Sequence, residues 1–264
     1  MWHLKVPKII HFYWGGSILP YVRFKTVESF IRLNPDWKVM FWYPTVSSSH
    51  ITWETKELDY KVSCKDYLPV LMDLPIIKNT IDFDQIGFYN EVPENFKSDF
   101  IRTYLLSSYG GVWSDMDIIY IKAIDKLEVN IKENKDKDSF VCISDYGHSV
   151  GFLMSSEGSQ FFHMMKCNIA SEFKSNDYQC IGPKIYNKYC PFLLPSMVNI
   201  KMNAIYPHNA TYVYEFFDGS KPHFADVTIG VHWYAGHPKW GQWLKETDGG
   251  LIKLGDCIID NLIK

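Results

Sequence analysis

The pattern of apolar and polar positions at the start of the chain predicts a strand, a helix and a second strand. Residues 8–13 form a short apolar run that ends at Gly15-Gly16, which is typical of a buried strand followed by a close turn. Helical periodicity over 21–33 stops before Asn34-Pro35, and 37–43 form a second apolar run. A strand, a helix and a strand in this order predict an α/β unit with a parallel sheet.

A longer amphipathic pattern begins at Ser98 and predicts a second helix. Its apolar side chains gather on one face, whereas Asp99 and Arg102 fall on the opposite face, where a ligand can reach them. Gly110-Gly111 then supply the left-handed cap that ends the helix. The apolar run that follows, 112–121, predicts a buried strand interrupted by two acids.

Those two acids, Asp115 and Asp117, are one residue apart in the predicted strand. Because side chains alternate along a strand, both carboxylates are expected to point the same way. No lysine stands beside them, and a hard divalent cation with oxygen ligands relieves the repulsion of such a pair. A triplet of this kind is also common in solvated turns. The helix, the two glycines and the apolar run around it favour a metal site.

Further elements are predicted beyond the acidic pair. Residues 66–78 contain two prolines and predict only short or irregular helices. Later strands are expected at 139–144, 151–155 and 228–234. A helix is expected at 157–173, and another short helix begins at Gly182-Pro183-Lys184.

The chain resembles the metal-dependent glycosyltransferases with a DXD sugar-binding region, the group around glycosyltransferase family 32 and the glucosylating bacterial toxins. The resemblance rests on S-D-x-x-R followed by G-G-x-aromatic-x-D-x-D, which this chain carries from Ser98 to Asp117, and on the strand and turn at 7–16. It implies a single GT-A-type α/β domain over 1–264, with a mostly parallel mixed central sheet flanked by helices. Residues 1–125 would bind the nucleotide sugar and the metal, and 126–264 would form the acceptor side with a C-terminal metal and lid segment.

The resemblance also implies roles on the donor side. Trp14 would stack on the nucleotide base, within a binding segment that includes Phe12, Gly15 and Gly16. Asp99 would accept hydrogen bonds from the donor sugar, and Asp115 would either share this task or bind the ribose. Arg102 would reach the sugar or the phosphates as a fixed cationic fork.

A late aromatic segment, 231–243, completes the expected site. Enzymes of this group often add a histidine from such a segment, so His232 joins Asp115 and Asp117 as an expected ligand of Mn²⁺ or Mg²⁺. Trp240 and Trp243 either close over the nucleotide as a lid or anchor the C-terminus. Lys239 is a candidate phosphate contact. The alternative of a zinc site, built from the histidines at 208, 223, 232 and 237, matches no spacing typical of zinc.

Composition narrows the functional classes to which the protein can belong. The net charge of −3, from 27 basic and 30 acidic residues, gives no electrostatic reason to expect nucleic acid as a partner. Six cysteines without a C-x-x-C pair indicate reduced thiols. The sequence shows no membrane-spanning run or signal peptide, so we expect a soluble cytoplasmic protein.

The predicted function is transfer of a hexose from a UDP- or GDP-sugar to a glycan or other hydroxyl acceptor. The resemblance implies retention of configuration; an inverting enzyme would need a base, for which Asp145 and Asp177 are the candidates. A non-catalytic carbohydrate-binding protein and a metal-dependent phosphoryl-transfer enzyme remain as alternatives. The sequence does not determine the oligomeric state.

Overall fold

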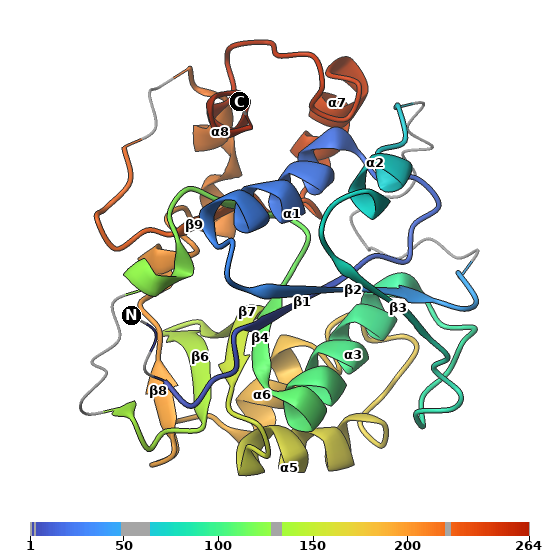
Figure 1. Cartoon of the computed structure of the whole chain (residues 1–264), viewed down its shortest axis with the longest axis vertical. Helices are drawn as coiled ribbons and strands as arrows, with labels where there is room; N and C mark the ends of the chain where they lie inside the picture. Colours follow the sequence, from blue (N-terminus) through green and yellow to red (C-terminus); the bar gives the residue numbers. More distant parts are fainter. Residues whose placement is uncertain (1, 3, 49–63, 128–133, 220–222, 264) are drawn as a thin grey trace.

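A computed structural model describes residues 2, 4–48, 64–127, 134–219 and 223–263 (Figure 1). A seven-stranded sheet runs through the centre in the order β3-β2-β1-β4-β7-β6-β8. These strands are β1 (Ile9–Tyr13), β2 (Lys38–Pro44), β3 (Ile77–Ile81), β4 (Gly111–Ser114), β6 (Ser139–Ser144), β7 (Gly147–Ser155) and β8 (Met197–Asn199). The neighbours among β3, β2, β1 and β4 are parallel, as are β6 and β8, whereas β7 runs antiparallel to both its neighbours. The predicted α/β class with a mostly parallel mixed sheet is therefore confirmed.

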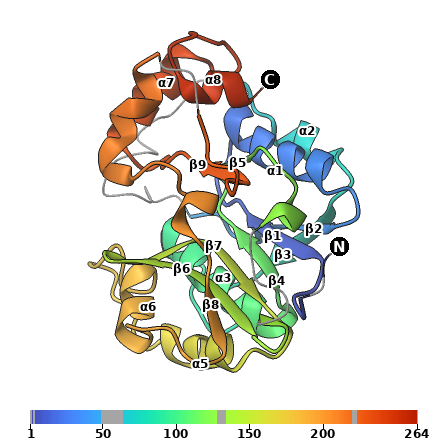
Figure 2. The same ribbon diagram turned by 90° about the vertical axis from the view of Figure 1, so that its left-hand side faces the viewer.

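Helices cover both faces of this sheet, as the two orthogonal views show (Figures 1 and 2). One face carries α1 (Tyr21–Leu33), with α2 (Leu68–Met72) beside it. The opposite face carries α3 (Glu94–Tyr109), α5 (Gln160–Ile169) and α6 (Pro183–Tyr189).

The alternation of side chains in β1 divides the interior into two cores. Ile10 and Phe12 are fully buried in the core beneath α1, together with Phe30 of that helix. Tyr13 points the other way, into the core beneath α3 and α5. Each fully buried aromatic side chain stabilises the fold by roughly 2–3 kcal/mol, so both layers hold the strand in register.

A second, two-stranded sheet stands above the first and supports the C-terminal part of the chain. It pairs β5 (Ile118–Tyr120) with β9 (Gly230–His232) in antiparallel register, with Ile118 opposite His232. The third core packs these strands against α7 (Pro238–Glu246) and α8 (Ile258–Leu262). Short 3₁₀ helices, η2 (Ile124–Lys126), η3 (Met202–Ala204) and η4 (Ala210–Phe217), fill the connections.

Backbone geometry explains why α3 ends where the sequence predicts. Gly110 and Gly111 have φ angles of 62° and 91°, which side-chain-bearing residues rarely adopt. A Cβ on Gly111 would lie 2.5 Å from the carbonyl oxygen of Ile9 in β1. The buried His11 ring lies 2.9 Å from the Gly110 carbonyl and accepts a hydrogen bond from Trp42. Burial lowers the pKa of His11 to about 4, so this histidine is a neutral structural link.

Three expectations about local structure need correction. The predicted single strand over 112–121 is two strands in different sheets, and Asp115 to Asp117 form the turn between them. Strand β3 follows α2 directly, in a stretch where only irregular helices were expected. The second late strand begins at Gly147 and forms a hairpin with β6. The predictions at 21–33 and 139–144 agree with α1 and β6 in both bounds.

Candidate active site

A cavity of about 500 Å³ lies where the chain leaves β1 and β4. Ligands of open α/β sheets commonly bind at the carboxyl ends of the strands, because backbone groups and loop side chains converge there. The walls come from the turn after β1, the first turns of α3, the turn between β4 and β5, the first half of β7 and the segment after β9. All three acids of the predicted donor site, Asp99, Asp115 and Asp117, line this cavity.

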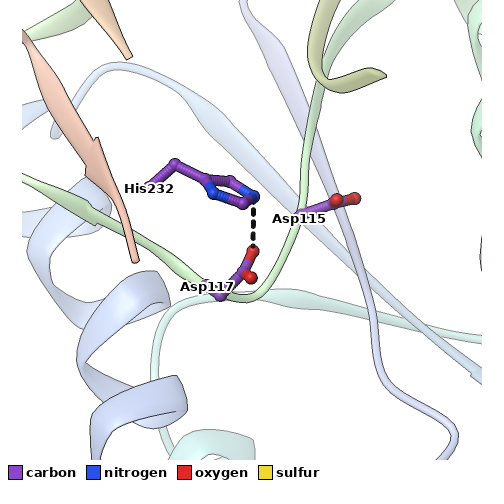
Figure 3. A group of neighbouring side chains, drawn as sticks. All are labelled: Asp115, Asp117 and His232. Carbon is purple, nitrogen blue, oxygen red and sulfur yellow. Dashed lines mark ion pairs between the residues drawn. The ribbon is translucent and has the colours of Figure 1, made fainter. Parts of the chain in front are cut away.

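Asp117 and His232 meet in the cavity because β5 pairs with β9 (Figure 3). His232 Nε2 lies 3.2 Å from Oδ1 of Asp117, and the backbone N–H of Ala235 donates to Oδ2 at 2.9 Å. Burial acts to raise the pKa of the Asp117 carboxyl, but His232 and then Arg23 outweigh it and hold that pKa well below the usual range. Asp117 is therefore an anion at neutral pH.

Asp115 is oriented by neighbours on the far side of the turn. The indole N–H of Trp113 donates to its Oδ1 at 2.7 Å, and Nη2 of Arg102 lies 3.5 Å from the same oxygen. Its backbone N–H donates to the carbonyl of Gly151 at 2.8 Å, which ties the turn to β7. The carboxylate therefore lies on the side of Arg102, and Figure 3 shows it pointing away from the His232 ring.

Asp99 and Arg102 form a buried ion pair on the cavity side of α3. Their Oδ1 and Nη2 atoms are 2.7 Å apart, and Nη1 of Arg102 also donates to the carbonyl of Val150 at 2.9 Å. Burial raises the pKa of Asp99 to about 6, although Arg102 opposes the shift. A Cβ on Gly182 would lie 2.7 Å from Oδ2 of Asp99, so this glycine lets the α6 segment approach the acid.

Trp14 lines the other end of the cavity, directly after β1. The guanidinium of Arg23 lies 4.7 Å from the centre of its ring and 5.4 Å from the centre of the Trp233 ring. These distances fit cation–π contacts, which fix the Arg23 charge in the cavity wall. A Cβ on Gly16 would touch the Trp14 ring at 2.8 Å, so the turn requires a glycine there.

Beneath the turn after β1, a buried polar network holds Gly15 in place. Oε2 of Glu94 accepts a hydrogen bond from the Tyr13 hydroxyl at 2.6 Å, and Oε1 pairs with the fully buried Lys97 at 2.9 Å. A Cβ on Gly15 would lie 1.7 Å from Oε2 of Glu94. The first turn of α3 therefore packs directly under the predicted nucleotide-binding turn.

The residues assigned from the sequence divide into two groups. Those lining the cavity are Trp14, Gly15, Gly16, Asp99, Arg102, Asp115, Asp117 and His232. Phe12 is fully buried in the core beneath α1, and Trp240 and Trp243 are buried in the third core, which favours the anchoring role over the lid. The Lys239 ammonium lies 5.3 Å from the centre of the Phe217 ring, and Lys239 is absent from the cavity lining.

Other assigned groups also lie apart from the cavity. Asp145 is exposed in the β6–β7 turn, and Asp177 pairs with Lys184 at 2.6 Å. All six cysteines are free thiols, as expected. Within the described part of the chain, no helix is long and apolar enough to cross a membrane.

Several cavity residues were not among those assigned from the sequence. Arg23 lies on α1, whose amphipathic pattern is otherwise ordinary, and its side chain is buried. Asn95 lies one helical turn before Asp99, and neither atom of its buried carboxamide has a hydrogen-bond partner in the described part of the structure. The same is true of the Tyr206 hydroxyl. The position of Asn95, four residues before Asp99 on the same helix face, could have indicated its place.

The donor set fits one hard divalent cation. Asp115, Asp117 and His232 each offer a ligand atom, and these atoms lie within 4.8 Å of one another. Ligands on opposite sides of an ion at 2.1–2.6 Å are about 4–5 Å apart, so a spread of this size suits a single ion. The two carboxylates are ligands of the kind that suits Mg²⁺ or Mn²⁺. Among the described residues, the histidines outside this group do not form a further cluster of three metal-binding side chains.

Comparison with known families found a match that lies almost entirely within the N-terminal half of the chain. Residues 20–135 match the family model described as "Glycosyltransferase sugar-binding region containing DXD motif". This segment holds Asp99, Arg102, Asp115 and Asp117, so the resemblance drawn from the sequence is confirmed. The chain carries a glycosyltransferase sugar-binding region of the DXD type, and its mixed α/β sheet agrees with the GT-A architecture that the resemblance implies.

Solved glycosyltransferase structures show a looser likeness. "PaToxG Glycosyltransferase" has a TM-score of 0.48 and 16% identity, with 70% of each chain covered. A glycosyltransferase involved in the glycosylation of the major capsid of PBCV-1 has a TM-score of 0.48 and 11% identity, covering 90% of this chain and 100% of that one. GlyE of Streptococcus pneumoniae TIGR4 has a TM-score of 0.48 and 15% identity, covering 86% and 54%. At these scores the function rests on the family match and the site. A comparison with curated proteins found no match.

Proposed function

We propose that this chain is a metal-dependent hexosyltransferase that uses a UDP- or GDP-sugar as donor. The observation that carries the proposal is the convergence of the DXD acids with His232 in one cavity, inside the segment that matches the glycosyltransferase family. His232 lies far outside the matched segment, so the structure adds a third donor atom that the family match does not contain.

Asp115, Asp117 and His232 would hold the Mn²⁺ or Mg²⁺ ion. When bound, this ion neutralises the negative charge that grows on the nucleoside diphosphate as it leaves the sugar. If Nε2 of His232 were the ligand atom, it would have to bind the ion without a proton, and the ion would take the place of its direct contact with Asp117.

The other residues of the cavity bind and orient the donor. Trp14 offers an aromatic surface for the nucleotide base, and Arg23 beside it adds a fixed positive charge near the diphosphate. Asp99 accepts hydrogen bonds from sugar hydroxyls. Arg102 holds both Asp99 and Asp115 in place through its ion pairs. The donor thus extends from the turn after β1 towards β7.

We propose retention of configuration and a glycan or glycoconjugate hydroxyl as acceptor. Neither Asp145 nor Asp177 lines the cavity, so neither is placed to deprotonate an acceptor there. In this arrangement residues 1–125 supply the donor site and 126–264 supply His232 and the acceptor side. NMR of the product anomer tests the stereochemistry, and an inverted product contradicts it.

The experiment that tests the function measures release or transfer of hexose from UDP- and GDP-sugars, with Mn²⁺ and with excess EDTA. We expect turnover only with the metal. Asp117→Asn keeps the shape of the side chain but removes its charge, and should lower turnover on the order of 100-fold or more.

Asp260→Asn is the matched control. Asp260 is buried and accepts two backbone hydrogen bonds, as Asp117 accepts one, but it lies outside the cavity lining. This variant should retain metal-dependent turnover. Equal turnover in EDTA, or equal loss in both variants, contradicts the proposed function. Sugar binding without nucleotide binding would instead indicate a carbohydrate-binding protein.

A further inference from the structure

The hydroxyl of Tyr206 is buried without a hydrogen-bond partner among the described residues. This is unusual, because buried tyrosine hydroxyls normally find a partner and an unsatisfied one is destabilising. Tyr206 lines the cavity, so a bound ligand can supply the missing acceptor.

The Tyr206 ring is held firmly beside the metal-binding group. Its centre lies 5.0 Å from the centre of the His232 ring and 6.4 Å from that of Tyr234. The backbone before it is tied to β9, because the N–H of His232 donates to the carbonyl of Ile205 at 2.9 Å. The hydroxyl therefore has a defined position rather than a choice of rotamers in solvent.

Gly151 shows where that hydroxyl lies in the cavity. A Cβ built on Gly151 would be 2.9 Å from Oδ2 of Asp115 and 3.1 Å from the Tyr206 hydroxyl. All three residues line the cavity. The hydroxyl and the first acid of the DXD motif thus flank the same small space, which only a glycine at 151 leaves open.

We propose that Tyr206 is a donor-binding residue, whose hydroxyl donates a hydrogen bond to an oxygen of the nucleotide sugar beside Asp115. The proposal rests on the proposed function, since it assumes that this cavity binds the donor. The acceptor oxygen belongs either to the diphosphate or to the transferred hexose, because both carry oxygen atoms that accept such a bond. Tyr206 acts there as a neutral hydrogen-bond donor in a cavity that the positively charged Arg23 and Arg102 also line.

Tyr206→Phe tests this, because it removes the hydroxyl and keeps the ring against His232. Since the hydroxyl forms no bond within the free protein, the melting temperature of the metal-free, ligand-free variant should equal or exceed that of the wild type. The dissociation constant of the nucleotide sugar, measured by calorimetry with Mn²⁺, should rise about 10- to 100-fold, as expected for one lost bond to a polar or charged oxygen.

Calorimetry with the nucleoside diphosphate alone identifies the acceptor. Weaker binding of both ligands indicates that an oxygen of the diphosphate accepts the hydrogen bond. Weaker binding of the nucleotide sugar alone indicates that an oxygen of the hexose accepts it. Each result supports the role of Tyr206 as a donor contact.

Tyr120→Phe is the matched control. Its buried hydroxyl donates to Ser114 at 2.8 Å and lies outside the cavity lining, so its loss should lower the melting temperature and leave donor affinity unchanged. If Tyr206→Phe behaves in the same way, the inference is overturned and Tyr206 is structural. Unchanged affinity overturns it whatever the melting temperature. A wild-type chain that binds no nucleotide sugar overturns the proposed function, and the inference with it.

Discussion

Asp99→Asn should make the free protein more stable at pH 7 and lower its affinity for the nucleotide sugar. The Asp99 side chain is buried beside Arg102, and burial raises the pKa of this acid to about 6 from the ordinary 3.8 despite the ion pair. The folded chain therefore holds the proton more tightly than the unfolded chain does. Stability falls as the pH rises from about 4 to about 6, because the acid must ionise in a place that disfavours its charge.

The size of the effect follows from the shift. About two pKa units at about 1.4 kcal/mol each give a difference of about 3 kcal/mol between the neutral and the ionised side chain. Asn resembles the neutral form in shape and cannot ionise. The variant should exceed the wild type in free energy of unfolding by up to about 3 kcal/mol at pH 7, and by much less at pH 4.

Donor binding should show the opposite preference. With a pKa of about 6, Asp99 is about 90% ionised at pH 7 and about 10% ionised at pH 5. If the anion accepts hydrogen bonds from the sugar, the affinity of the wild type for the nucleotide sugar falls about tenfold over this interval. The Asn variant binds the nucleotide sugar more weakly at pH 7, and its affinity lacks the pH dependence that comes from ionisation of Asp99. The titrations of the ligand and of the metal-binding residues are common to both proteins, so the difference between the two curves reports Asp99 alone.

Guanidinium unfolding at several pH values between 4 and 8, and calorimetry of the same two proteins with Mn²⁺, measure both effects. A stability difference that stays constant across the range would refute the raised pKa. A pH-dependent stability difference with parallel binding curves would refute the contact between Asp99 and the sugar. The unfolding curves therefore test the raised pKa of Asp99, and the binding curves test its contact with the sugar.

Two further predictions concern glycine and tryptophan positions. Gly111→Ala should destabilise the chain by roughly 3 kcal/mol or more in urea unfolding, because its φ is 91° and the new Cβ lies 2.5 Å from the Ile9 carbonyl. Gly158→Ala, with φ of 73° and open space around it, should cost only about 1–2 kcal/mol; equal losses would show that the contact with β1 does not matter. Trp14→Ala should weaken nucleoside diphosphate binding by roughly 5- to 100-fold through lost stacking, and unchanged affinity would exclude Trp14 from the base site.

The local elements were largely predictable because their signals lie within short stretches of sequence. Helical periodicity and the Asn34-Pro35 stop determine α1, and Gly110-Gly111 determine the end of α3. Prediction failed where a short segment depends on its neighbours. Strand β3 is mostly exposed and exists because it pairs with β2, so its own apolar pattern is weak.

The candidate site was predictable where its residues are close in sequence. Asp99, Arg102, Asp115 and Asp117 share one motif, and all four line the cavity. The two acids nevertheless do not alternate along one strand as predicted, since they occupy a turn between two sheets. Asp115 faces Arg102, whereas Asp117 faces His232.

By itself, the sequence therefore determined the α/β order of elements, the positions of the glycine turns and the acidic motif, because each depends on neighbouring residues. The tertiary structure decided which distant side chains complete the cavity. Pairing of β5 with β9 brings His232 to Asp117. The hydrogen bond from His232 to the carbonyl of Ile205 places Tyr206 beside the His232 ring, where it flanks Gly151 together with Asp115. The tertiary structure also placed Trp240 in the third core. Such contacts depend on strand pairing and close packing across long chain separations, which no local pattern encodes.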